Sequence, residues 1–143
     1  MNIIWFTIDF KSFFQWFKGL FSWSDKYVLF VDDEVNDFPV IDSLKEQNYK
    51  IDTLNDIENI DCPHISRAKI IFIDYKWVWK KFTKNEQWIW LIKALKSKYW
   101  KKKTIILFSA SRFSLDKETQ IADDKIAKNA SLQEFIAIIQ KYS

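Results

Sequence analysis

The sequence contains one cysteine and one histidine among its 143 residues. A lone cysteine, Cys62, excludes a disulfide within the chain, and Cys62 with His64 supplies too few ligands for an ordinary zinc site. Proteins without disulfides are typical of reducing compartments. We therefore expect a cytoplasmic protein whose stability depends on neither disulfides nor zinc.

Glycine, proline and arginine are also scarce. The chain has one glycine, two prolines and two arginines, so its turns must use asparagine, aspartate and serine. Twenty lysines raise the formal net charge only to +3. Nucleic-acid-binding surfaces combine arginine with interleaved aromatic side chains, whereas the aromatics here gather at the N-terminus. This composition argues against nucleic acid as a partner.

Aromatic side chains are abundant, and residues 1–25 carry an unusual share of them. No basic leader or small-residue cleavage site is present, and Asp9, Lys11 and Lys18 interrupt the apolar run. Neither a signal peptide nor a membrane-spanning helix therefore fits. At about 100° per residue the apolar side chains share one helical face, which predicts an amphipathic helix. The residues on this face are Phe10, Phe13, Phe14, Phe17, Leu20 and Phe21.

From Lys26 onward, short apolar runs alternate with helical patterns. Strands are expected at Tyr27–Val31, Lys50–Leu54, Lys69–Ile73, Thr104–Phe108 and Lys125–Ala127. Helices are expected near Pro39–Gln47, Ile57–Ile65, Glu86–Trp100, Leu115–Ile121 and Leu132–Tyr142. This alternation predicts an α/β fold with a doubly wound, five-stranded parallel sheet and helices on both faces. The expected organisation is an N-terminal helix over residues 1–25 and one domain over residues 26–143.

Polar residues follow the predicted strands at the positions where ligands bind in such sheets, beyond the carboxyl ends. The first strand ends in Asp32 and Asp33, the third in Asp74, the fourth in Ser109, and the fifth leads to Lys128. Clustered carboxylates repel one another unless a hard cation lies among them, and Mg²⁺ prefers such oxygen ligands. The hydroxyl and the ammonium are suited to an incoming phosphoryl group.

The segments VLFVDDE, IFID, LFSA and ADDKIAKNASLQEF, in this order and spacing, resemble the receiver domain of two-component response regulators. The resemblance runs from about Lys26 to the C-terminus. It implies that Asp74 accepts a phosphoryl group from a phosphohistidine, and that Asp33 and Asp74 bind Mg²⁺ directly. It also implies that Asp32 holds Mg²⁺ through water, that Ser109 binds a phosphoryl oxygen and that Lys128 pairs with the phosphoryl group.

The sequence departs from the family at several positions. Lys76 and Ser111 occupy variable positions that tune hydrolysis in the family, and we expect Lys76 to slow the loss of the phosphoryl group. Asn129 replaces the proline of a usually cis Lys-Pro pair, so this peptide is either strained or trans. Lys125 replaces the aromatic residue that the family uses as a switch, and the short segment between Ser109 and Lys128 predicts a stunted fourth helix.

The lysines are open to two interpretations. They can form an ordinary solvated face, or they can form a basic rim at the amino ends of the strands, beside the N-terminal helix. In the second case, residues 3–23 contact a membrane surface or an apolar partner. Alternatively, this helix folds back over the third helix of the domain as an additional layer. The residues of the expected rim are Lys50, Arg67, Lys69 and Lys101 to Lys103.

Three functions follow from the sequence. The leading one is a single-domain receiver, which is not an enzyme in its own right. It promotes its own Mg²⁺-dependent phosphorylation by a histidine kinase or phosphotransfer protein. It then acts by binding an output protein. No output domain follows Ser143 in this sequence. The second is a degenerate receiver that serves as an adaptor or assembly subunit without phosphorylation, at the membrane surface if residues 3–23 bind there. The weakest is a nucleic-acid binder.

Overall fold

The computed structural model describes residues 27–74, 87–99, 102–110 and 121–143, with only the backbone for residues 87–90. The strands are β1 (Tyr27–Val31), β2 (Lys50–Leu54), β3 (Ala68–Asp74), β4 (Thr104–Ser109) and β5 (Asp124–Ala127). The helices are α2 (Pro39–Glu46), α3 (Pro63–Arg67), α5 (Gln87–Tyr99) and α6 (Leu132–Tyr142), with a short 3₁₀ helix, η1 (Val35–Asp37). Residues 1–26 and 111–120 lie outside the described residues, and so do the predicted N-terminal helix and most of the predicted fourth helix of the domain.

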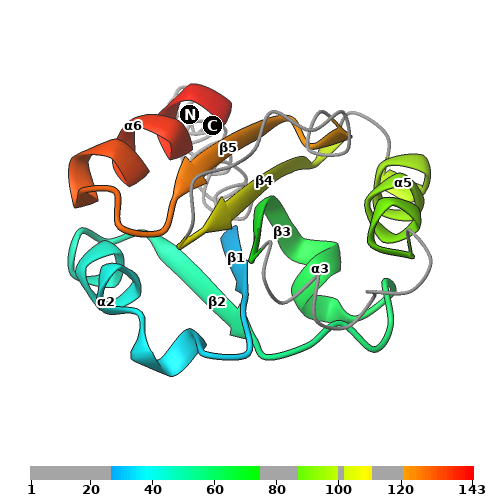
Figure 1. Cartoon of the computed structure of the whole chain (residues 1–143), viewed down its shortest axis with the longest axis horizontal. Coiled ribbons are helices and arrows are strands. Elements are labelled where there is room, and N and C mark those ends of the chain that lie inside the picture. Colours follow the sequence, from blue (N-terminus) through cyan, green and yellow to red (C-terminus); the bar gives the residue numbers. More distant parts are fainter. Residues whose placement is uncertain (1–26, 75–86, 100–101, 111–120) are drawn as a thin grey trace, which may run out of the picture.

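The five strands form one parallel sheet in the order β2-β1-β3-β4-β5. Helices α2 and α6 cover one face of the sheet, and α3 and α5 cover the other (Figure 1). This arrangement confirms the predicted doubly wound α/β fold. It also brings the carboxyl ends of β1 and β3, which are neighbours in the sheet, to the same edge.

The central strands form the core because both of their faces are buried. In β1, Leu29 and Val31 pack toward α3 and α5, whereas Val28 and Phe30 pack toward α2 and α6. Strands β3 and β4 alternate in the same way. Burying one such side chain stabilises the fold by about 1.5–3 kcal/mol. The buried side chains therefore fix the register of the strands and, with it, the positions of the residues that follow them.

Local signals set the ends of two helices. In α6, the Ser131 hydroxyl accepts a hydrogen bond from the Glu134 backbone N–H at 3.2 Å, and the Glu134 carboxylate accepts one from the Ser131 N–H at 2.7 Å. This reciprocal capping box satisfies two backbone donors at the helix start. Helix α2 begins with Pro39, whose fixed φ angle suits the first helical position.

The predicted helix Ile57–Ile65 was wrong in its position. The structure has a shorter helix, α3, at Pro63–Arg67. The Asp61 backbone N–H donates to the Asn59 side chain at 2.8 Å, and this Asx turn competes with helical hydrogen bonding. Pro63 then starts the helix, while Ile57 and Ile60 pack against the core from the preceding loop.

Within the part of the chain that the structure describes, no helix combines the length and the apolar character needed to cross a bilayer.

Candidate phosphoryl-transfer site

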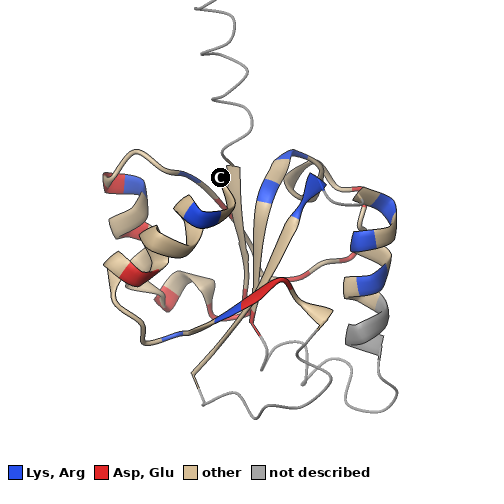
Figure 2. Ribbon diagram, turned by 90° about the horizontal axis from the view of Figure 1, so that it is seen from above, with Lys and Arg blue, Asp and Glu red and all other residues tan. Residues whose placement is uncertain are grey.

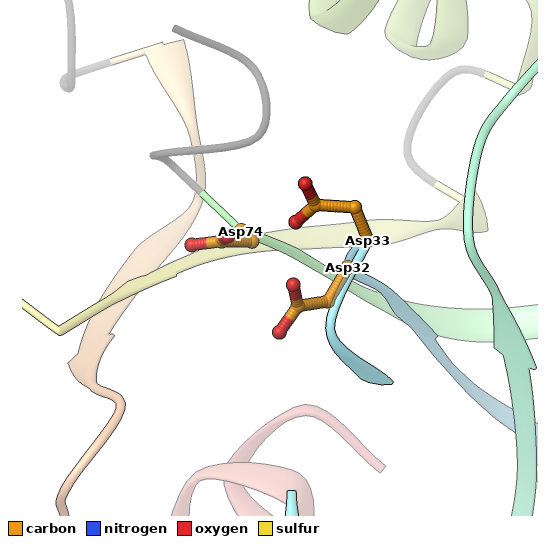
Figure 3. A group of neighbouring side chains, drawn as sticks. All are labelled: Asp32, Asp33 and Asp74. Carbon is orange, nitrogen blue, oxygen red and sulfur yellow. The ribbon is translucent and has the colours of Figure 1, made fainter. Parts of the chain in front are cut away.

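Three carboxylates meet at the carboxyl edge of the sheet. Asp32 and Asp33 directly follow β1, and Asp74 is the last residue of β3. Because Val31 pairs with Ile73 in the sheet, the next residues, Asp32 and Asp74, reach the edge side by side. One carboxylate oxygen from each of the three aspartates lies within 4.8 Å of the others (Figure 3).

Asp32 is a fully buried carboxylate with defined hydrogen-bond donors. Its Oδ1 accepts a hydrogen bond from the Glu34 backbone N–H at 2.9 Å, and its Oδ2 accepts one from the Lys128 ammonium at 2.6 Å. The Asp32 backbone N–H donates to the Leu54 carbonyl at 3.1 Å, so the chain is also fixed to the end of β2. A buried charge requires such compensation, because an unpaired one is strongly unfavourable.

Lys128 supplies the positive charge of the site. Its backbone N–H donates to the Ser109 carbonyl at 2.7 Å, which anchors the residue to the end of β4. Burial lowers the pKa of Lys128, but the hydrogen bond to Asp32 and the neighbouring carboxylates, Asp74 among them, outweigh this effect and raise the pKa above its ordinary value. Lys128 is therefore an ammonium ion throughout the physiological pH range.

The peptide between Lys128 and Asn129 is trans, because no cis peptide occurs among the described residues. The sequence left open whether this peptide is strained or trans, and the structure has the trans form. The trans loop still delivers the Lys128 ammonium to Asp32. Its turn is closed by a hydrogen bond from the Ala130 N–H to the Ala127 carbonyl at 3.0 Å.

Ser109 ends β4 at the same edge of the sheet. It is buried, and it lies one residue beyond Phe108, the register partner of Asp74. The hydroxyl therefore belongs to the strand next to the one that carries Asp74. Asp32, Asp33, Asp74, Ser109 and Lys128 thus come from the ends of four strands that the topology brings together.

The cluster fits Mg²⁺ in its ligand chemistry. All three side chains offer carboxylate oxygens, which this ion prefers, and two ligands of an octahedral Mg²⁺ lie at most about 4.2 Å apart. The spacing within the cluster, up to 4.8 Å, is close to that limit. Asp32, Asp33 and Asp74 are therefore the residues that would hold the ion.

Not every predicted residue can be placed. Lys76 and Ser111 lie outside the described residues. Lys125 is half-buried on β5, opposite Leu107 of β4. His64 and Cys62 lie at α3, away from the carboxylate cluster.

Sequence reasoning missed two aromatic residues of the site. The rings of Phe38 and Phe108 lie beside the Lys128 ammonium, at 5.8 Å and 5.6 Å from their centroids. One signal in the sequence could have indicated Phe38. This residue stands at the N-cap of α2, where a small polar residue is usual.

No protein-family model and no curated protein matches this sequence. Solved structures do match. The response regulator TrrA from Thermotoga maritima, in complex with Mg²⁺-BeF, is 23% identical with a TM-score of 0.63, over 82% of this chain and 99% of that chain.

Two further solved structures are similar to this chain. A receiver domain (CheY-like) from Methylobacillus flagellatus is 18% identical with a TM-score of 0.60, over 82% of this chain and 98% of that chain. A response regulator from Burkholderia pseudomallei, with a phosphorylated aspartic acid, is 17% identical with a TM-score of 0.58, over 80% of this chain and 66% of that chain. The chain therefore has the fold of a receiver domain, and its sequence is divergent.

Proposed function

We propose that this receiver-fold chain accepts a phosphoryl group on Asp74 in a Mg²⁺-dependent reaction and signals by binding a protein partner. The observation that carries the proposal is the meeting of Asp32, Asp33 and Asp74 within 4.8 Å of one another, with the Lys128 ammonium bonded to Asp32. The structural neighbours include one with Mg²⁺-BeF and one with a phosphorylated aspartic acid, which supports the same chemistry here.

The reaction is a transfer between two nucleophiles. A carboxylate oxygen of Asp74 attacks the phosphorus of a phosphohistidine, a P–O bond forms, and the P–N bond breaks with its electron pair on the departing imidazole. The site needs no side-chain acid or base, because positioning and charge neutralisation supply most of the catalysis in phosphoryl transfer. Bound Mg²⁺ would neutralise charge on the phosphoryl oxygens.

The chain's own residues have distinct roles in this reaction. Asp74 is held at the sheet edge by its register with β4, which fixes the backbone that carries its carboxylate. Lys128 compensates the negative charge of the phosphoryl group, and Ser109 donates a hydrogen bond to one of its oxygens. The phosphoryl donor is a histidine kinase or a phosphotransfer protein, and the output partner is a further protein.

The test is the intact mass of the protein after incubation with acetyl phosphate, with and without Mg²⁺. We expect a gain of one phosphoryl group that requires Mg²⁺ and is absent from Asp74→Asn. The matched control is Asp42→Asn, which changes an exposed aspartate on α2 and should leave the gain intact. No gain in the wild-type protein, together with no Mg²⁺ binding, would reject the proposal in favour of an adaptor that works without phosphorylation.

A further inference from the structure

Two phenylalanine rings flank the Lys128 ammonium. Its distances from the ring centroids of Phe38 and Phe108 are 5.8 Å and 5.6 Å, and the two centroids are 5.7 Å apart with an interplanar angle of 16°. Both distances lie within the roughly 6 Å over which an aromatic face attracts a cation. The ammonium is therefore placed by two rings as well as by Asp32.

The rings themselves are held rigidly. Phe38 and Phe108 are buried. Both pack against Phe30, at centroid distances of 6.0 Å and 5.8 Å, and Phe38 also packs against Phe135 at 5.7 Å. Phe72, the fifth ring of this cluster, stacks on Phe30 at 4.6 Å and has no described contact with Lys128. A rigid aromatic surface can restrict a long, flexible side chain at little further entropic cost, because the rings are already ordered.

Phe38 breaks a local rule of helix formation. It occupies the N-cap of α2, with φ −107° and ψ 94°, and makes no side-chain capping hydrogen bond. Serine, threonine, aspartate or asparagine would stabilise this helix start by about 1 kcal/mol. A residue that forgoes this stabilisation next to a charged site indicates a second role.

Lys128 needs such support. Its side chain is 20% exposed, so the ammonium could otherwise turn toward solvent. Its backbone is fixed to Ser109, but four methylene groups separate that anchor from the charge. The Asp32 oxygen and the two rings together hold the ammonium beside the carboxylate cluster.

We propose that Phe38 is a positioning residue: with Phe108, its ring holds the Lys128 ammonium on Asp32 at the edge of the carboxylate cluster, where it can meet a phosphoryl group. The placement of the ammonium on Asp32 is a property of the protein without ligand. Its contact with a phosphoryl group on Asp74 rests on the proposed function.

The first experiment observes the ammonium directly. In ¹H–¹⁵N spectra of lysine side chains, an ammonium held by a buried carboxylate is protected from exchange with water, and aromatic faces shift its protons upfield. We expect a protected, upfield-shifted signal that is absent from Lys128→Met. Phe38→Leu should remove the protection or the upfield shift, and Phe38→Tyr, which keeps the aromatic face, should retain both.

Phe72→Leu is the matched control, since it removes a ring from the same cluster that does not contact the ammonium. It should leave the Lys128 signal unchanged. An unaltered signal in Phe38→Leu, or an equal change in Phe72→Leu, would show that Phe38 only fills the core and would overturn the inference. If Phe38→Leu fails to fold by circular dichroism, Phe38→Met supplies the same test with a longer apolar side chain.

The second experiment measures the affinity for beryllofluoride, a phosphoryl mimic, in the presence of Mg²⁺. Loss of a cation–π contact predicts an affinity roughly three- to tenfold weaker in Phe38→Leu than in the wild-type protein or in Phe72→Leu. Equal affinities of Phe38→Leu and the wild type would refute the link to the phosphoryl group. If the wild type binds no beryllofluoride, the proposed function fails, and the ammonium spectra alone decide whether Phe38 positions Lys128.

Discussion

Asp32 and Asp33 are adjacent in the sequence and carry the same charge, but their environments differ. Asp32 is fully buried and bonded to Lys128, whereas Asp33 is exposed. Among the described side chains, the Lys128 ammonium therefore offsets part of the negative charge of the carboxylate cluster. Repulsion among the carboxylates would lower the stability of the folded chain and would favour binding of a cation.

Replacing Asp33 by asparagine should separate these two effects. Without metal, the loss of one like charge near Asp32 and Asp74 should raise the free energy of unfolding by about 1 kcal/mol, since charges about 4 Å apart interact by this amount in water. In the wild-type protein, Mg²⁺ at about one hundred times its dissociation constant should add about 2.7 kcal/mol. The variant should lose this increment. Urea denaturation with and without Mg²⁺ measures both quantities.

Asp37→Asn is the matched control for this prediction. Asp37 is an exposed aspartate of η1, close in sequence but outside the carboxylate cluster. It should change neither the stability without metal nor the increment from Mg²⁺. A destabilised Asp33→Asn variant, or one that keeps the whole increment, would contradict the role given to Asp33.

At the scale of elements, the sequence was informative where burial or capping is strong. Strands β1 and β2 were predicted to the residue and β3 to within one residue at each end. Helix α6 was also predicted in full, because its capping box marks the start. In contrast, the helix predicted at Ile57–Ile65 was misplaced relative to α3. Ile57 and Ile60 have helical spacing, but they belong to a loop that packs on the core.

The same distinction applies to the candidate site. Residues at strand ends, such as Asp32 and Asp74, could be located from the sequence, because parallel strands deliver their carboxyl ends to one edge. The contact of Phe38 with Lys128 could not be located, because it joins two loops that are distant in sequence. The pairing of Lys128 with Asp32 was missed for the same reason: the sequence shows which charges meet at an edge, not which atoms bond.

The short helix α3 and the start of β4 are joined by one lysine. The Lys103 ammonium donates to the carbonyls of Ser66 and Ala68 at 2.7 Å and 2.5 Å, and it lies 4.4 Å from the centroid of the Tyr99 ring. The Tyr99 hydroxyl donates to the Ile60 carbonyl at 2.9 Å. The two Lys103 contacts satisfy carbonyl groups at the end of α3, where the helix itself provides no partners.

Lys103 should make the stability of this junction depend on pH. Burial lowers the pKa of Lys103 from its ordinary value of 10.5 to about 8 in the folded chain. Between these pH values the unfolded chain binds more protons, so the free energy of unfolding should rise with pH. We expect the stability of the wild-type protein relative to Lys103→Met, measured by urea denaturation, to increase from pH 8 toward pH 10.

Lys102→Met, a change at the exposed neighbouring lysine, is the control and should not alter the pH dependence relative to the wild type. This comparison removes the contributions of ionisable groups that all three proteins share. If the stability of the wild-type protein relative to Lys103→Met stays constant or falls over this pH range, the folded chain does not disfavour the charged form of Lys103.

At the scale of the whole molecule, the described cations of the expected basic rim are less available than the sequence suggests. Arg67 donates to Asp52 at 2.6 Å, and Lys103 is engaged with backbone carbonyls. On α5, whose lysines are coloured in Figure 2, Lys96 pairs with Asp123 at 2.9 Å and Lys98 pairs with Asp61. Attraction to an anionic surface would therefore depend on fewer charges, and the apolar side chains of residues 3–23 would have to contribute most of any membrane affinity.

Deletion of residues 1–24 tests whether the apolar N-terminal segment, and not the basic rim, provides most of the membrane affinity. We expect the full chain to cosediment with phosphatidylserine vesicles, with a shallow dependence on salt because Arg67 and Lys103 of the described rim are already engaged within the chain. The deletion should abolish binding and leave the melting temperature of the domain nearly unchanged, whereas Lys102→Gln should weaken binding by only about 1 kcal/mol. If the deletion instead lowers the melting temperature sharply and the full chain ignores vesicles, the aromatic segment covers its own domain, and the membrane interpretation fails.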